Sequence, residues 1–220
     1  MEIFNENRAE SRELAGKMLA QKFVRTRFIN GVVVGIPYGG VSVASEIAKR
    51  LELPLDVMPC RTVKDPSDIT RNIGSVSVDE VYYHDCPYGT PQDYLYFQMV
   101  RLRNEIKFDN EFYYGDDDHQ LDFTGKTVIV VDDMLTSPDT LMAALMSIRK
   151  QRPARIIVAI PFVEAEAARV IQSACDEFVF LRMKQKIASP VEFYNEFPPV
   201  DEWTVRELLQ QSNVALMEAV

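Results

Sequence analysis

Cysteine and histidine are scarce in this chain of 220 residues. The three cysteines, Cys60, Cys86 and Cys175, lie far apart without CxxC spacing, and one stays unpaired in any disulfide scheme. This usage favours a reducing compartment over secretion. The two histidines, His84 and His119, lack the spacing of a zinc site, so we expect them at the surface or in hydrogen-bonded loops.

Long apolar runs and an excess of positive charge are also missing. No apolar run approaches the ~20 residues of a membrane-spanning helix, and the charged, amphipathic N-terminal segment lacks the apolar core of a signal peptide. The formal net charge of −9 argues against a broad basic surface for DNA or RNA. We therefore expect a cytoplasmic protein that binds neither a membrane nor DNA.

The chain does contain enough apolar sequence for one core, since 47% of its residues are hydrophobic. Strand-length apolar runs alternate with helical patterns along most of its length. Five such runs predict strands, at residues 31–36, 55–60, 127–131, 156–160 and 177–181. Because these strands lack polar alternation, both faces of their sheet must be covered. The pattern predicts a single α/β domain with a doubly wound parallel sheet.

The remaining segments predict additions to this sheet. Residues 61–85 contain the polar stretch and the NIGSV and VYY segments of a β-hairpin or flap. Residues 95–108 have helical spacing, and residues 113–120 indicate an exposed acidic loop. Helices are also predicted at the N-terminus, after the first strand, from about Asp139, and in a final segment capped by Asp201.

The most informative stretch is VIVVDDMLTSPDT, residues 128–140. Its predicted strand runs into Asp132 and Asp133, and ligand sites of open parallel sheets lie at this carboxyl end. Two adjacent carboxylates could bind vicinal hydroxyls or a divalent cation. The following loop, residues 136–140, could wrap a phosphate with N–H groups at a helix N-terminus.

Two other interpretations fit parts of this stretch. Ser137, Pro138 and Asp139 also suit the N-cap, first position and first turn of an ordinary helix. An acidic pair also follows a strand in receiver domains, but there it closes the first strand, and no later strand here ends in an acceptor aspartate. Two adjacent like charges cost energy unless a cation or hydroxyl donors compensate them, which favours a binding loop.

A second loop, Pro37-Tyr38-Gly39-Gly40, follows the first predicted strand. Its two glycines allow close backbone approach at the start of a helix, as an oxyanion cradle requires. Plain turn chemistry explains the two glycines equally well. Both loops lie at the carboxyl edge of the predicted sheet.

Taken together, these residues resemble the type I phosphoribosyltransferases, and most closely a bacterial group whose substrate is undefined. The resemblance is carried by residues 128–140, by GIPYGG, by Arg61 just after the next strand, and by NIGSV. FNENRAESRELA near the start, with FYNEF and DEWTVRELL near the end, extends it from Phe4 to Leu209.

The resemblance implies a site for phosphoribosyl pyrophosphate (PRPP). Asp132 and Asp133 would hold the ribose hydroxyls as the catalytic acidic pair. Mg²⁺ would be bound through PRPP, with the same two aspartates as its candidate protein ligands. The other implied contacts are Thr136, Ser137, Asp139 and Thr140 at the 5′-phosphate, and Tyr38, Gly39, Gly40 and Arg61 at the pyrophosphate.

The resemblance also implies how the chain is organised as one phosphoribosyltransferase-like domain over residues 1–220. Residues 61–85 would form a flexible hood that closes over the site and excludes water. Residues 86–124 would be a helical and acidic-loop insertion, and residues 185–220 a C-terminal extension. The family further implies a homodimer.

Two departures from the family pattern leave different functions open. Pro138 stands where glycine is usual, and Asp139 places a charge beside the proposed phosphate, which costs roughly 4 kcal/mol at ~4 Å and an effective dielectric constant of ~20. Tyr38 replaces a common arginine, a loss of about 1.5–3 kcal/mol. The first hypothesis is an Mg-dependent enzyme of nucleotide metabolism that transfers ribose 5-phosphate from PRPP to or from a nitrogenous base. The second is a weakened or inactive regulatory protein that binds PRPP or a nucleotide. A module whose aromatic segments form contact surfaces is the third hypothesis, and no pattern indicates the acceptor base.

Overall fold

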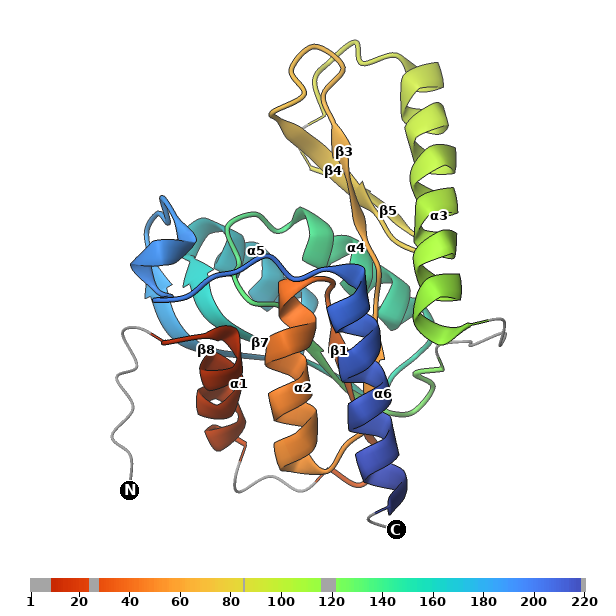
Figure 1. Cartoon of the computed structure of the whole chain (residues 1–220). Coiled ribbons are helices and arrows are strands. Elements are labelled where there is room, and N and C mark those ends of the chain that lie inside the picture. The colour runs from red at the N-terminus through yellow and green to blue at the C-terminus, as the bar shows by residue number, and fades with distance from the viewer. Residues whose placement is uncertain (1–8, 24–27, 85, 116–121, 219–220) are drawn as a thin grey trace.

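The computed structural model describes residues 9–23, 28–84, 86–115 and 122–218, with side chains to residue 214 (Figure 1). Its helices are α1 (Arg12–Gln21), α2 (Gly39–Leu51), α3 (Gln92–Tyr114), α4 (Asp139–Lys150), α5 (Ala165–Ala174) and α6 (Glu202–Glu218), with the short 3-10 helix η1 (Pro190–Glu192). Its strands are β1 (Gly31–Gly35), β2 (Leu55–Val57), β3 (Arg61–Lys64), β4 (Asn72–Val76), β5 (Val81–Tyr83), β6 (Thr127–Val131), β7 (Arg155–Glu164) and β8 (Glu177–Lys184).

Five of these strands form a parallel sheet in the order β2-β1-β6-β7-β8. The strand β6 lies at its centre, where Ile129 pairs with Val33 of β1 and with Ile157 of β7. All five strands predicted from the apolar runs are present, although β2 is shorter than predicted and β7 longer. The prediction of a doubly wound parallel sheet is confirmed.

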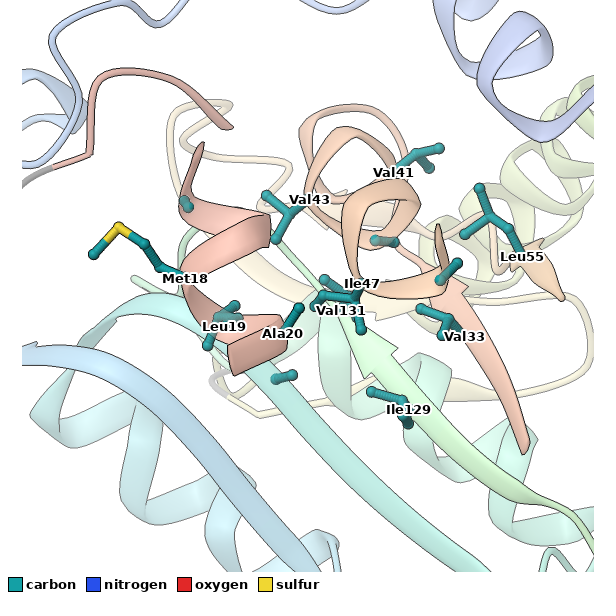
Figure 2. Packing of buried hydrophobic residues seen from close by; sticks show 14 of the residues in the cluster. Met18, Leu19, Ala20, Val33, Val41, Val43, Ile47, Leu55, Ile129 and Val131 are labelled. Carbon is teal, nitrogen blue, oxygen red and sulfur yellow. The ribbon is translucent and has the colours of Figure 1, made fainter. Parts of the chain in front are cut away.

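One face of the sheet is covered by α1, α2 and α6, which lie in front of it in Figure 1. Alternate strand residues point to this side, because successive side chains of a strand face opposite ways. Figure 2 shows this layer, in which the labelled sheet residues Val33, Ile129 and Val131 lie against side chains of α1 and α2. The fully buried helix residues there include Leu19, Val43 and Ile47.

The opposite face of the sheet is covered by α4 and α5. The intervening strand residues, among them Val128, Val130 and Val158, pack there against Leu141 of α4 and Ile171 of α5. Each central strand therefore contributes to two separate cores, which explains why its sequence shows no polar alternation.

The strands β3, β4 and β5 form a second, antiparallel sheet that rises above the parallel sheet beside α3 (Figure 1). A small third cluster of buried side chains joins it to α3: Val63, Ile73, Val76, Leu95, Leu102 and Ile106. The hairpin predicted within residues 61–85 is present as β4 and β5, and β3 extends it to three strands.

Some helix boundaries differ from those predicted. The helix α3 runs on to Tyr114, into the segment predicted as a loop, and the rest of that acidic loop, with His119, lies outside the described residues. The N-terminal helix begins only at Arg12, after Ser11, whose side chain accepts a hydrogen bond from the Leu14 N–H. At the other end, Asp201 caps α6 as predicted, since its Oδ1 accepts the Thr204 N–H at 2.9 Å. Across the described segments, none of the helices has both the length and the apolar character needed to span a bilayer.

Candidate active site

Two loops meet at the carboxyl edge of the parallel sheet. One joins β1 to α2 and contains Tyr38, with Gly39 and Gly40 in the first turn of the helix; the other joins β6 to α4. The backbones are in close contact, because a Cβ added at Gly40 would lie 2.8 Å from the carbonyl oxygen of Val131. At Gly39 an added Cβ would collide with Oδ2 of Asp133. The glycines are therefore required by the approach of the second loop, beyond any ordinary turn.

The carboxylate of Asp132 lies directly at the end of β6. Its Oδ1 accepts the N–H of Asp133 at 2.8 Å, which fixes the carboxylate at the start of the loop. Burial raises the pKa of Asp132 well above its ordinary value, and the negative charge of Asp133 raises it further. A carboxyl group in this state gains from hydroxyl donors, and sugar hydroxyls are such donors.

The neighbouring Asp133 has a different environment. Its Oδ2 accepts a hydrogen bond from Nε of Arg12 at 2.6 Å, and its carbonyl oxygen accepts one from the Tyr194 hydroxyl at 2.7 Å. Arg12 is almost fully buried, donates from Nη1 to the carbonyl oxygen of Pro198, and lies 3.6 Å from the centre of the Phe197 ring. The second acidic side chain is thus already paired with α1 beneath the C-terminal segment.

The loop from β6 to α4 has the features of an anion cradle. It is fixed at Leu135, whose N–H donates to the carbonyl oxygen of Phe162 on β7 at 2.9 Å. Within the described part of the chain, four N–H groups around the helix start have no acceptor: those of Thr136, Ser137, Thr140 and Leu141. Pro138 is the N-cap of α4, one position before the place predicted for it. Unpaired N–H groups at the positive end of a helix dipole favour an anion.

Asp139 begins α4 with its carboxylate turned into the protein, where it is 1% exposed. Its Oδ2 accepts a hydrogen bond from the Ser137 hydroxyl at 2.6 Å. Its Oδ1 lies 2.5 Å from Nδ1 of His84, the residue that follows β5, and accepts no hydrogen bond from the described residues. The aspartate predicted at the phosphate is therefore in the predicted loop, with the imidazole of His84 from the hood against its carboxylate.

The two residues predicted at the pyrophosphate, Tyr38 and Arg61, lie together. Arg61 begins β3, and its Nη2 donates to the Tyr38 hydroxyl at 3.3 Å. The same nitrogen forms a short ion pair with Asp109 of α3, and Nε lies 3.9 Å from Oε2 of Glu105. Burial raises the pKa of Asp109, although the guanidinium of Arg61 opposes the rise. The Pro37–Tyr38 peptide bond in this loop is cis.

The structure adds three residues to those expected at the site: Arg12, His84 and Asp109. Each pairs with a predicted site residue that is far away in the sequence, so no local pattern could identify the pair. The burial of Arg12, which implies a partner because charged residues are rarely buried unpaired, is visible only in the structure.

The site offers few ligands for a metal ion. In the segments that the structure describes, no three His, Cys, Asp or Glu side chains are grouped as a metal site. Asp133 is engaged by Arg12, which leaves Asp132 as the carboxylate at the end of β6. Mg²⁺ commonly binds to one or two carboxylates and takes its other ligands from substrate phosphates and water, so this donor set fits a Mg²⁺ ion that arrives with a phosphate ligand.

Comparison with known proteins identifies the family. The model of the phosphoribosyl transferase domain matches residues 5–195. The chain is 27% identical over 210 residues to "Putative phosphoribosyl transferase Rv0571c" of Mycobacterium tuberculosis (strain ATCC 25618 / H37Rv), a match that covers 93% of this chain and 47% of the relative. It therefore spans about half the length of this curated relative. The solved structure of TT1426 from Thermus thermophilus is 30% identical, with a TM-score of 0.78 over 93% of this chain and 98% of that one. The chain belongs to the phosphoribosyl transferase domain family.

Proposed function

We propose that the protein transfers a ribose 5-phosphate group from PRPP to a nitrogenous base, or in the reverse direction, with Mg²⁺. The observation that carries the proposal is that one short loop, from β6 to α4, begins with the Asp132 carboxylate and ends in the unpaired N–H groups at the start of α4. A ribose 5-phosphate carries hydroxyls and a phosphate on one ring, which are the groups that these two features bind.

The residues of the chain would act mainly by positioning the substrate and neutralising charge. Asp132 would accept hydrogen bonds from the ribose hydroxyls. The N–H groups of Thr136, Ser137 and Thr140 would hold the 5′-phosphate, and the loop at Gly39 would approach the pyrophosphate. The hood would exclude water, since a ribosyl centre with positive charge in the transition state would otherwise be hydrolysed.

Asp132 would be the candidate protein ligand of a Mg²⁺ ion that arrives with PRPP. When bound, this ion would neutralise part of the charge of the leaving pyrophosphate. Asp133 would support the loop from its ion pair with Arg12 and would not contact the metal.

A second candidate function is a regulatory protein that binds PRPP or a nucleotide without turnover. The observation that favours it is the state of Arg61, which is already paired with Asp109 and close to Glu105. A pyrophosphate group would have to compete with these two carboxylates for the guanidinium. Like charges near the ligand weaken binding and reduce stabilisation of the leaving group.

Two measurements separate these functions. Calorimetric titration with PRPP and Mg²⁺ should show binding to the wild-type protein, and pyrophosphate release should follow when a panel of nucleobases is added. Asp132→Asn should lower the affinity or the rate at least tenfold, because it replaces one of the two carboxyl oxygens that can accept ribose hydroxyls by an amide NH₂ donor. The control Asp122→Asn replaces an exposed aspartate that caps a turn at Thr124 and should change neither. Binding without pyrophosphate release would support the regulatory function, and no binding would contradict both.

A further inference from the structure

The contact between His84 and Asp139 joins two parts of the chain that the sequence separates. His84 follows β5 of the hood, and its N–H donates to the carbonyl oxygen of Ile73 on β4 at 3.3 Å, which fixes the backbone at this point. Its imidazole Nδ1 lies 2.5 Å from Oδ1 of Asp139, the first residue of α4. The histidine side chain is 34% exposed, whereas the aspartate side chain is 1% exposed. The hood therefore supplies the partner of a buried carboxylate in the loop proposed for the 5′-phosphate.

A carboxylate at this position has an alternative set of donors. The N–H groups of Thr140 and Leu141, together with those of Thr136 and Ser137, are unpaired in the described structure and lie at the start of the same helix. Negatively charged side chains in the first turn are attracted to such groups. Asp139 would therefore compete with a phosphate for the cradle unless neighbouring groups hold its carboxylate elsewhere. The Ser137 hydroxyl donates to Oδ2, and the imidazole of His84 lies against Oδ1.

A second set of contacts fixes the hood to the other end of α4. The hydroxyl oxygen of Ser77, just after β4, lies 2.6 Å from that of Ser147, and Lys150 Nζ lies 3.0 Å from a carboxylate oxygen of each of Asp79 and Glu80. These contacts attach the β4–β5 turn to the last turns of α4, away from the cradle. They provide a control that separates anchoring of the hood from an effect on the phosphate.

We infer that His84 is a positioning residue for the 5′-phosphate: its imidazole lies against the Asp139 carboxylate and keeps it away from the N–H cradle, so that the cradle is free for a phosphate. The inference rests on the proposed function. It explains how a family loop can carry an aspartate where a phosphate is expected. It also couples the hood to the phosphate loop, because a movement of β5 away from α4 would separate His84 from the Asp139 carboxylate.

The test is a double-mutant cycle, with ribose 5-phosphate as the probe and binding measured by calorimetry. His84→Ala should weaken binding of ribose 5-phosphate about tenfold to a hundredfold, since it frees a charge next to the phosphate. In the Asp139→Asn background the same change should have less than a threefold effect, because no charge remains to be kept away from the cradle. Pyrophosphate, which would bind at the Tyr38 loop, should bind equally to all four proteins.

Controls distinguish this role from a purely structural one. Lys150→Ala removes the anchor at the far end of α4 and should leave the affinity for ribose 5-phosphate unchanged. Thermal melts of every variant report whether the fold is retained. Equal losses from His84→Ala in both backgrounds would overturn the inference, as would an unchanged affinity. Failure of the wild-type protein to bind ribose 5-phosphate would also overturn the inference. The proposed function would be contradicted only if the wild-type protein failed to bind PRPP with Mg²⁺ as well.

Discussion

Replacing Arg12 by alanine should destabilise the protein by about 3–5 kcal/mol, the typical cost of removing one partner of a buried ion pair. The side chains of Arg12 and Asp133 are only 8% and 16% exposed. The substitution removes charge-assisted hydrogen bonds to Asp133 and to the carbonyl oxygen of Pro198, each 2.6 Å long and worth about 1.5–3 kcal/mol. It also removes a cation–π contact with Phe197 worth about 1–2 kcal/mol. These contributions share one side chain and do not add fully, so the expected total stays within the range for a broken pair.

Urea denaturation followed by circular dichroism measures this change. A matched control lies on the same helix: Lys17 and Glu46 form an ion pair of 3.8 Å in which the lysine side chain is 58% exposed. Lys17→Ala should cost at most about 1 kcal/mol, because solvent screens an exposed pair. Asp133→Asn in the Arg12→Ala background should recover part of the loss, since it removes the uncompensated charge. A loss from Arg12→Ala no greater than that from Lys17→Ala would refute this account of the site.

Three further predictions follow from the same loops. Gly39→Ala should lower the free energy of unfolding by about 1–3 kcal/mol in urea denaturation, because its Cβ would collide with the Asp133 carboxylate. The control Gly31→Ala should cost less, since the nearest atoms there belong to a flexible leucine side chain and a phenylalanine Cβ. Equal losses from the two substitutions would contradict the clash. Asp132→Asn should be neutral in stability below the unfolded-state pKa of about 3.9 and increasingly stabilising as pH rises from there to the raised pKa of the folded state, because over this range the unfolded wild type ionises while the folded wild type keeps its proton. Melting temperatures from pH 4 to 8 test this, and a constant difference would contradict it. Tyr38→Arg should tighten binding of pyrophosphate with Mg²⁺ by about 1.5–3 kcal/mol in calorimetry, because it adds a charged donor to the loop; an unchanged affinity would mean that this loop does not contact pyrophosphate.

The parallel sheet could be predicted because its signals are local. Strands such as β6 are continuous apolar runs, and each is followed by a loop and a helical pattern, so element type and order can be inferred from short windows of sequence. The Asp201 cap of α6 is predicted from cap chemistry for the same reason, and the same chemistry places the start of α4 to within one residue, with Pro138 rather than Ser137 as its N-cap. The neighbouring positions of the two site loops also follow from the topology of a parallel sheet.

The charge pairing at the site could not be predicted, since it depends on which distant segments pack on the sheet edge. Arg12 and Asp133 are 121 positions apart, and Arg61 and Asp109 are 48 apart. The long helix α3 also extends beyond its predicted end, because the acidic stretch YYGDDDHQ, residues 113–120, indicates an exposed loop. In the structure Tyr113 is buried, and the Tyr114 hydroxyl donates to the carboxylate of Asp56 in β2. A tertiary contact of this kind overrides the weak local preference of the segment.

Three close contacts, two ion pairs and the His84–Asp139 contact, have a common arrangement that bears on how the site binds a ligand. In each, a charged residue of a site loop or strand is paired with a segment outside the parallel sheet: Asp133 with α1, Asp139 with the hood and Arg61 with α3. Two kinds of polar group at the sheet edge are not held in an ion pair with another segment, among the residues that the structure describes: the N–H groups at the start of α4, and the carboxyl of Asp132, whose Oδ1 accepts only the N–H of the next residue. Binding by fixed dipoles needs no separation of existing ion pairs, so these groups should supply most of the initial affinity. Arg61 would contribute only after it separates from Asp109, which makes α3, as well as the hood, an element whose position should control the strength of pyrophosphate binding.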